Sequence, residues 1–286
     1  MKCTFIALGL LLVVSAGQSV HATTYRCPPG QLAFTFDDGP HPKHTPQVLD
    51  VLQKAGIKGT FYLLGEKVKA HPELVQRIHR EGHEIGIHGW DHQRMDKLSG
   101  GATAVEKQLR DTWDAILKAL GNTRNPAVIK TMRPPYGKTG RQLVPKVAGK
   151  LYLEAVNWSF SPQDWQYIGE GTLDSQPADV AVGKVNAATT QMLADIDWRL
   201  KHMNPVKRGE IILQHDTLPQ TPGVLANLIE RIQSKQFRIV TVSQCLADNP
   251  SKANLQSERL VDKLEIGYRH VKNATRNLVA SVRKSR

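Results

Sequence analysis

The feature that most constrains the fold is a regular alternation of short apolar stretches with longer amphipathic ones. Seven apolar stretches have the length and composition of strands: 32–36, 60–64, 84–88, 129–133, 151–158, 211–215 and 238–242. Four stretches between them resemble amphipathic helices: 45–56, 72–82, 104–121 and 222–235. Strands joined by helices of this length pair in parallel through right-handed crossovers. We therefore expect an α/β fold.

Seven parallel strands favour a distorted or incomplete (β/α) barrel, with an open sheet as the alternative. In a barrel of this kind, the functional side chains lie at the C-terminal ends of the strands. Charged or titratable residues follow five of the predicted strands here: Asp37, Asp38, His88, Arg133, Asp164 and His215. This gathering predicts a site at the C-terminal edge of the sheet.

The first 22 residues have the pattern of a secretory signal peptide. Lys2 precedes an apolar stretch, and small residues lead to a cleavage site after Ala22. A membrane anchor is the less favoured alternative, because a helix that spans a bilayer needs about 20 apolar residues. We expect a secreted, periplasmic or cell-surface protein with a catalytic domain over 23–250.

Of the three cysteines, Cys3 would leave with the signal peptide, so Cys27 and Cys245 remain. An oxidising compartment favours a disulfide between them, at the two ends of the domain. The alternative is two unrelated buried thiols.

Residues 251–286 hold nine Lys or Arg against three Asp or Glu, so much of the net charge of +12 lies in this tail. Apolar residues three and four apart predict an amphipathic helix there. It could dock on the barrel, contact an acidic wall polymer or membrane surface, or mediate dimerisation. We find no nucleic-acid motif and leave the oligomeric state open.

A second informative stretch is HEIGIHGWDHQRM, in which His88 and His92 are four residues apart. Such a pair is more often two surface histidines on a turn. With a nearby carboxylate, however, two imidazoles form a ligand set for catalytic Zn²⁺, and Co²⁺ or other divalent ions also fit. One of the adjacent Asp37 and Asp38 could bind the metal while the other accepts a proton. Both can do so only if the strand breaks into a turn, as Gly39 and Pro40 indicate; the alternative is an ordinary polar turn.

Five short motifs occur in order along the chain: TFDDGP (35–40), HGWDH (88–92), RPPYG (133–137), DW (164–165) and LQH (213–215). Together they resemble the motifs of the polysaccharide deacetylases, carbohydrate esterase family four, over most of residues 25–248. The stretches YRCPPG and FRIVTVSQCLADNP are similar to the chitin-deacetylase branch, where flanking cysteines are paired.

The resemblance implies specific roles. Asp37 would be the general base, held ionised by Arg133, and His215 would be the general acid, oriented by Asp164. The implied metal ligands are Asp38, His88 and His92.

The resemblance also implies substrate contacts. The Tyr136 backbone N–H would stabilise the oxyanion, and Trp165 and Leu213 would wall the acetyl pocket. From its position between the two histidines, we expect Trp90 to contact substrate too.

The chain departs from the family pattern at Gly89, where Ser or Thr is usual, and at Ser161, where the family has an acidic residue. We also expect residues 159–185 to form a long loop that shapes the binding groove.

The expected function is metal-dependent removal of N-acetyl groups from N-acetylglucosamine units of chitin or chito-oligosaccharides. Peptidoglycan deacetylation and acetylxylan esterase activity are the alternatives with the same residues. A non-catalytic carbohydrate-binding protein is the alternative from another class.

Overall fold

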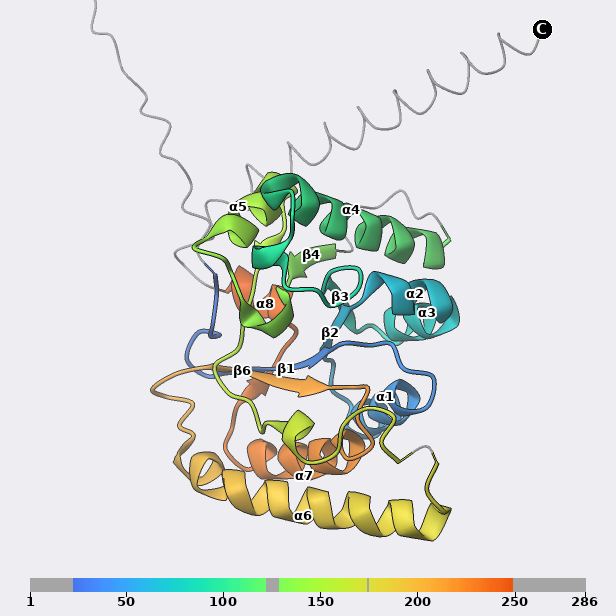
Figure 1. Cartoon of the computed structure of the whole chain (residues 1–286). Helices are drawn as coiled ribbons and strands as arrows, with labels where there is room; N and C mark the ends of the chain where they lie inside the picture. The colour runs from blue at the N-terminus through green and yellow to red at the C-terminus, as the bar shows by residue number, and fades with distance from the viewer. Residues whose placement is uncertain (1–22, 122–128, 174, 249–286) are drawn as a thin grey trace, which may run out of the picture.

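The computed structural model describes residues 23–121, 129–173 and 175–248, and within them an α/β fold (Figure 1). The sheet has the order β5-β4-β3-β2-β1-β6, with β7 paired to β1, and every pairing is parallel. The strands are β1 (Gln31–Asp37), β2 (Thr60–Leu63), β3 (Glu84–Ile87), β4 (Ile129–Met132), β5 (Glu154–Ala155), β6 (Glu210–His215) and β7 (Arg238–Ile239). The predicted distorted barrel of about seven parallel strands is confirmed.

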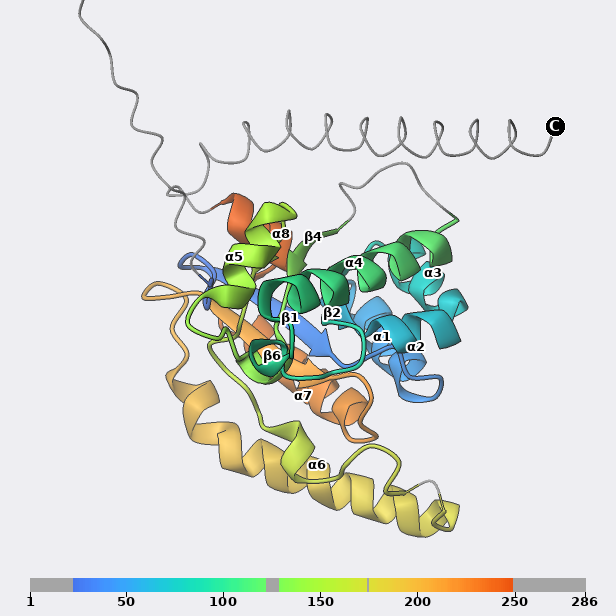
Figure 2. The same cartoon turned by 45° about the horizontal axis from the view of Figure 1, so that its top comes forward.

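Helices cover the outside of the curled sheet. They are α1 (His44–Ala55), α2 (Gly65–Ala70), α3 (Pro72–Arg80), α4 (Gly101–Ala119), α5 (Leu143–Lys150), α6 (Ala178–His202) and α7 (Thr221–Gln233). The short α8 (Val242–Ala247) packs instead on the inner side, in an apolar cluster with Ala33 and Ile211. Helices α1 and α6 pack on α7, whereas α2, α3 and α5 pack on α4 (Figures 1 and 2). Three short 3-10 turns lie near the strand ends: η1 (Met95–Lys97), η3 (Pro135–Gly137) and η4 (Asp164–Gln166).

The barrel is incomplete between β5 and β6. Strand β5 has only two residues, and the chain that follows it makes a single parallel bridge from Phe160 to Ile212 of β6. Tyr152, inside the predicted strand 151–158, has a left-handed φ of 59°. That conformation is incompatible with an extended strand, which explains why β5 is shorter than expected.

The two faces of β1 have different neighbours, one apolar and one polar, although all seven of its residues are buried. Leu32, Phe34 and Phe36 belong to the main apolar core under the helices. On the opposite face, Thr35 and Asp37 both contact the buried Arg133 side chain. The inner face of the barrel is therefore polar toward the C-terminal ends of the strands.

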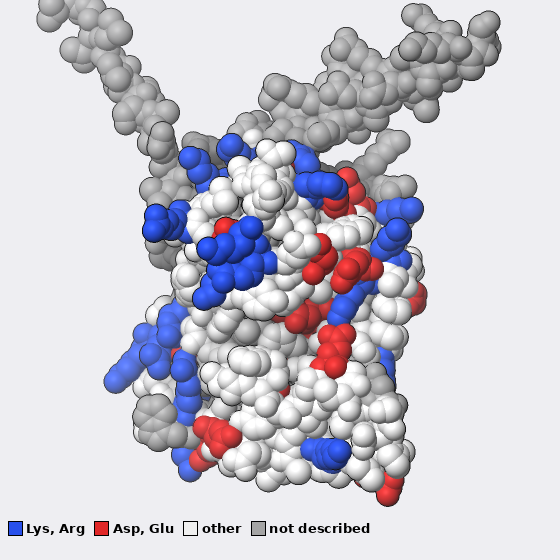
Figure 3. Space-filling view, in the orientation of Figure 1, with Lys and Arg blue, Asp and Glu red and all other residues white. Residues whose placement is uncertain are grey.

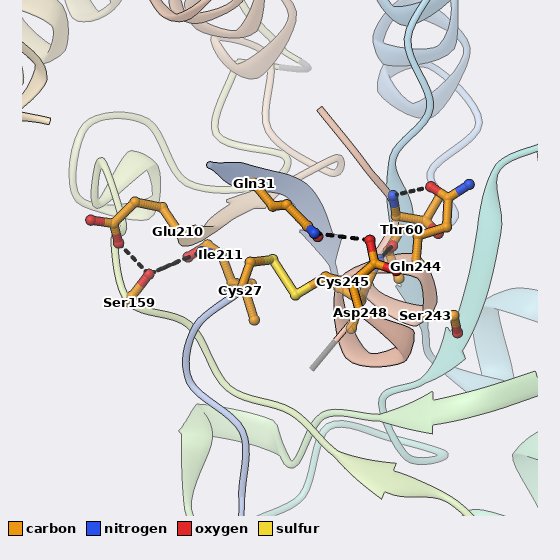
Figure 4. Close-up of a disulfide and its surroundings, with 12 residues drawn as sticks. Cys27, Gln31, Thr60, Ser159, Glu210, Ile211, Ser243, Gln244, Cys245 and Asp248 are labelled. Carbon is orange, nitrogen blue, oxygen red and sulfur yellow. Dashed lines mark hydrogen bonds between the residues drawn. A yellow bond between two sulfur atoms is a disulfide. The ribbon is translucent and has the colours of Figure 1, made fainter. Parts of the chain in front are cut away.

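The predicted disulfide is present: Cys27 is bonded to Cys245 of α8, 218 residues away in sequence, with 5.2 Å between the Cα atoms. Figure 4 shows the bond beside the hydrogen bond from Gln31 Nε2 to Asp248 Oδ2, which measures 2.9 Å. Together these contacts tie both ends of the described domain to the N-terminal edge of the sheet.

The prediction of a continuous loop over 159–185 is wrong in its second part, because α6 begins at Ala178. The first half of this helix is largely exposed, and its large buried side chains, among them Met192, Ile196 and Leu200, come later. The exposed half therefore lacks the apolar periodicity on which the sequence prediction depended.

The predicted signal peptide (1–22) and basic tail helix (251–286) lie outside the described residues. Across the described parts of the chain, we find no helix with the length and apolarity that crossing a bilayer requires.

Candidate active site

The C-terminal ends of β1, β3, β4 and β6 bring the predicted site residues together. Asp37 ends β1 and pairs in register with His215, the last residue of β6. His88 directly follows β3, and Arg133 directly follows β4. The strand ends thus place side chains from distant parts of the sequence at one edge of the sheet.

Asp38 leaves the strand conformation, which lets both aspartates face the same site. Its φ is 72°, in the left-handed region that non-glycine residues seldom occupy. His92 and Tyr136 have similar φ values of 60° and 59°. Each such residue costs about 1–3 kcal/mol, and these conformations are concentrated at functional sites in proteins.

Asp38, His88 and His92 offer three ligand atoms that lie within 4.8 Å of one another. Asp38 Oδ1 is 3.2 Å from Nε2 of His88 and 3.2 Å from Nε2 of His92. Ligand atoms that share one tetrahedral Zn²⁺ at about 2.1 Å lie roughly 3.4 Å apart. The spacing therefore suits a small divalent ion.

The hydrogen bonds around these atoms also fit a cation. Nδ1 of His88 lies 2.8 Å from the carbonyl oxygen of Arg133, a contact that places a proton on Nδ1, so that in the neutral ring the Nε2 lone pair is directed at Asp38. Asp38 Oδ1 is buried and has no hydrogen-bond donor among the described residues. Lone pairs facing a carboxylate oxygen need a positive charge between them, and so the residues fit a divalent metal.

Burial would raise the pKa of Asp38, but the imidazoles of His88, His215 and His92 that face this carboxyl outweigh burial and lower its pKa. The pKa of this carboxyl is held well below its usual range. Asp38 is thus in the ionised form that metal binding requires.

Asp37 is held by the fully buried Arg133, whose Nη1 donates to Asp37 Oδ1 at 2.8 Å and to Thr35 Oγ1 at 2.7 Å. The guanidinium also donates to the carbonyl oxygens of Val156 and Asn157. These bonds leave Arg133 little freedom to move, and they fix one Asp37 oxygen. The other oxygen, Oδ2, lies 3.7 Å from His88 Nε2, beside the candidate metal site.

On the other side of the site, His215 is oriented by the buried Asp164. Asp164 Oδ1 lies 2.8 Å from His215 Nδ1, and Asp164 Oδ2 accepts the His215 backbone N–H at 2.7 Å. Nε2 of His215 therefore faces the site, 4.0 Å from Asp38 Oδ2. Burial lowers the pKa of His215, but the charge of Asp164 and its hydrogen bond outweigh burial and raise it to about 10.

Two residues that the sequence analysis missed hold Asp164 in place. The buried Gln220 donates from Nε2 to the carbonyl oxygens of Asp164 and Ile168, and Thr221 Oγ1 donates to Asp164 Oδ2. A Gln and a Thr before a helix carry no recognisable signal, because their partner lies more than 50 residues away.

The loop that carries His92 is also supported by an unpredicted residue. Gln108 of α4 accepts the Trp90 backbone N–H at 2.6 Å and donates from Nε2 to Asp91 Oδ1 at 2.9 Å. Gly89 has φ 92°, and a Cβ there would lie 2.6 Å from Met95 Cε. The backbone at position 89 thus favours glycine, and Gln108 supports the neighbouring residues of this loop.

The predicted substrate residues differ in their placement. Tyr136 and Trp165 are exposed, at 57% and 56%, and the Tyr136 ring lies 4.5 Å from the His92 ring. Leu213 is buried in β6. The half-buried Trp90 indole packs closely over Gly65 of α2. Its contact with substrate stays a prediction, and this packing gives it a structural role as well.

Asp216, directly after His215, is a further buried residue that the sequence analysis did not single out. Its carboxylate accepts a hydrogen bond from the Thr45 hydroxyl. The same carboxylate fills the space beside Gly39, because a Cβ added to Gly39 would lie only 2.3 Å from Asp216 Oδ2. Burial raises the pKa of Asp216 to about 7. The residue after Asp38 must therefore be very small for the β1 turn to pack against β6.

The chain is similar to known proteins in sequence and in overall structure. The sequence model described as "Polysaccharide deacetylase" matches residues 24–156. The peptidoglycan-N-acetylglucosamine deacetylase PgdA of Listeria monocytogenes is 32% identical over 214 residues, which are 75% of this chain and 38% of PgdA. The chain thus spans well under half the length of that relative.

A second relative matches over most of its length. The chitooligosaccharide deacetylase of Sinorhizobium fredii is 31% identical over 224 residues, covering 74% of this chain and 89% of that protein. Among solved structures, the Bc1960 peptidoglycan N-acetylglucosamine deacetylase has a TM-score of 0.61 and 29% identity, covering 78% of this chain and 92% of that one.

Proposed function

The chain belongs to the polysaccharide deacetylase family, and we propose that it removes the acetyl group from N-acetylglucosamine units of a glycan chain by metal-dependent hydrolysis. The observation that carries the proposal is the convergence of Asp38, His88 and His92 between two further groups. Asp37 lies on one side of this cluster and His215 on the other.

Asp38, His88 and His92 would hold a divalent cation, for which Zn²⁺ is the proposed identity and Co²⁺ an alternative. When bound, such an ion polarises the amide carbonyl and lowers the pKa of water so that a nucleophile is available near neutral pH.

Asp37 acts as the general base in this proposal and accepts a proton from the attacking water. Arg133 fixes Asp37 Oδ1 and keeps its charge, so Oδ2 is the oxygen available to the proton. General-base catalysis of this kind contributes about 10²–10⁴-fold to the rate.

His215 acts as the general acid. The amine that leaves when the amide bond breaks is a very poor leaving group unless it is protonated. Because Asp164 binds Nδ1, the proton that His215 donates comes from Nε2, which faces the site. Asp164 is a positioning residue that sets this orientation.

The exposed Tyr136 and Trp165 stand beside these groups and would contact the sugar and its acetyl group, with the Tyr136 backbone N–H at the oxyanion and Leu213 behind the acetyl pocket. Chito-oligosaccharides, which the sequence analysis expects, and peptidoglycan both contain N-acetylglucosamine. The name of the Sinorhizobium relative supports chito-oligosaccharides as the substrate, and the name of the Listeria relative supports peptidoglycan.

The test is acetate release from purified protein on chitin oligomers, peptidoglycan and acetylxylan under one set of conditions. We expect release from the first two, loss of release with a chelator, and recovery with added Zn²⁺ or Co²⁺. Metal binding itself is measured by competition with a chromophoric chelator.

Asp37→Asn is the matched variant, because it keeps the shape of the base and removes its charge. We expect acetate release to fall about 10²–10⁴-fold. Asp179→Asn, which changes an exposed carboxylate at the start of α6 that has no part in the proposed chemistry, is the control. Equal release by Asp37→Asn and the control would disprove the assignment.

Export from the cytoplasm is part of the proposal. The Cys27–Cys245 disulfide is compatible with an oxidising compartment. Fractionation of expressing cells and N-terminal sequencing of the exported protein test it, and a mature N-terminus at residue 23 is the expected result.

A further inference from the structure

A hollow lies beside the candidate active site. It has a volume of about 520 Å³ and is lined by residues of η1 and of the loop that leads to α5: Asp96, Lys97, Gly137, Lys138, Thr139, Gly140 and Arg141. None of these residues has a role in the proposed hydrolysis.

The hollow is strongly basic. Lys97, Lys138 and Arg141 are exposed, and none of the three has a carboxylate partner within the described part of the chain. Its one acid, Asp96, is occupied by a two-point contact with Arg94, at 3.0 and 2.7 Å. Lys97, Lys138 and Arg141 therefore outnumber the single carboxylate of the hollow, and none of them forms an ion pair among the described residues. Figure 3 shows a dense group of basic side chains on this face, near the α5 and α8 labels of Figure 1.

The hollow is next to the site along the chain and in space. Lys138 follows Tyr136 by two residues, so their Cα atoms are at most about 7.6 Å apart. The Tyr136 ring in turn lies 4.5 Å from the ring of His92. A glycan that reaches the candidate metal site past Tyr136 therefore passes close to Lys138.

The backbone around the hollow has an unusual shape. Arg141 and Gln142 have left-handed φ values of 49° and 75°, and Gly140 has a φ of 55°. A Cβ on Gly140 would lie only 2.5 Å from Asp96 Cβ, which shows how closely this loop packs on η1. Left-handed residues next to a site are a common feature of ligand-binding loops.

We propose that this hollow is a subsite for a carboxylate carried by a sugar unit near the one that loses its acetyl group. The inference rests on the proposed function and adds a preference: the protein favours glycans with acidic substituents over neutral chains of N-acetylglucosamine. Lys and Arg attract a carboxylate by charge and by hydrogen bonding, whereas a neutral sugar offers them only the weaker hydrogen bonds of its hydroxyl and amide oxygens.

The test compares two soluble chitin derivatives of equal chain length, one carboxymethylated and one glycol-substituted and therefore neutral. The pocket variant is Lys97→Gln/Lys138→Gln/Arg141→Gln in the full chain. The control is Lys118→Gln/Lys146→Gln/Lys150→Gln, which removes the same charge from exposed positions on α4 and α5 outside the hollow.

For the pocket variant we expect kcat/KM on carboxymethyl chitin to fall about tenfold, mostly through KM, while kcat/KM on glycol chitin stays within about twofold. The control variant should stay within about twofold on both polymers. The advantage of wild type on carboxymethyl chitin should also shrink as salt rises, because exposed charges are screened over about 8 Å at physiological ionic strength.

Equal losses on both polymers, no loss on either, or the same loss in the control would overturn the subsite. If wild type releases no acetate from any substrate, the proposed function has failed instead. Affinity electrophoresis through gels that contain either polymer then still tests the subsite. Equal retardation of the pocket and control variants by carboxymethyl chitin would reject it.

Discussion

Carboxylates lie at both ends of the sheet, but their hydrogen-bond partners differ. At the N-terminal end, the Glu84 carboxylate accepts hydrogen bonds from the hydroxyls of Thr60, Thr131 and Ser243 and from the Ser243 backbone N–H. At the C-terminal end, Asp38 Oδ1 is buried with no donor among the described residues. The first arrangement stabilises the fold, whereas the second is the one that we propose holds a cation.

The difference extends to the backbone. The N-terminal end carries the disulfide, and His83 there accepts the Gly59 backbone N–H at its Nδ1 atom, 3.1 Å away. The C-terminal end has left-handed residues at Asp38, His92 and Tyr136. Stability is therefore concentrated at one end of the strands and strain at the other, as expected where strain is part of a site.

The largest expected effect is on the N-terminal end. Replacing both Cys27 and Cys245 with Ser should lower the free energy of unfolding by about 4–5 kcal/mol, because the disulfide closes a very long loop. Urea unfolding with and without the substitutions measures the change. At low urea, kcat/KM should stay close to wild type, and a loss of activity in still-folded protein would show that the two ends are not separate.

The second prediction concerns pH and His83, which lies on the N-terminal side of β3. Burial lowers the pKa of His83 to about 4, so between about pH 6.5 and 4 the unfolded chain binds a proton that the folded chain does not. Stability from this group is therefore full above about pH 6.5 and is lost as the pH falls toward 4, by about 3 kcal/mol.

His83→Gln keeps an acceptor for the Gly59 N–H but does not titrate. As the pH falls from 7.5 to 4, the free energy of unfolding of wild type should decrease by about 3 kcal/mol more than that of the variant. Parallel curves would show that His83 does not contribute to acid sensitivity.

The third prediction compares one carboxylate at each end of the sheet, in its effect on activity and on stability. Asp38→Asn should lower kcat/KM by about a hundredfold or more through weaker metal binding, and leave the free energy of unfolding of the metal-free protein within about 1 kcal/mol. Glu84→Gln, the matched variant at the other end, should lower stability by about 2 kcal/mol and leave kcat/KM unchanged. The comparison fails if both variants lose the same property.

The smallest expected effect concerns the loop that carries His92, one of the proposed metal ligands. Gln108→Ala should weaken metal affinity about tenfold, since the Trp90 N–H and Asp91 contacts that hold the His92 loop are lost. Competition with a chromophoric chelator measures the affinity. Gln76→Ala, which removes a comparable hydrogen bond to Ala119 at the end of α4, is the control and should leave metal affinity unchanged.

Much of the fold and the site could be predicted because their signals are local. Short apolar stretches, each followed by a charged residue, place Asp37, His88, Arg133 and His215 at strand ends. Parallel strands then force these ends to one edge of the sheet. The long α6 escaped prediction because its exposed first half has no apolar stripe.

The sequence by itself determined which residue types stand at the strand ends, and hence that two imidazoles and two carboxylates would share one edge. Only the tertiary structure decided which atoms are available: Arg133 fixes one oxygen of Asp37, and Asp164 leaves Nε2 of His215 facing the site. Gln108, Gln220 and Asp216 act across separations from 18 to 171 residues. Contacts between residues so far apart in sequence depend on how the strands and helices pack in three dimensions, and no local sequence pattern predicts them.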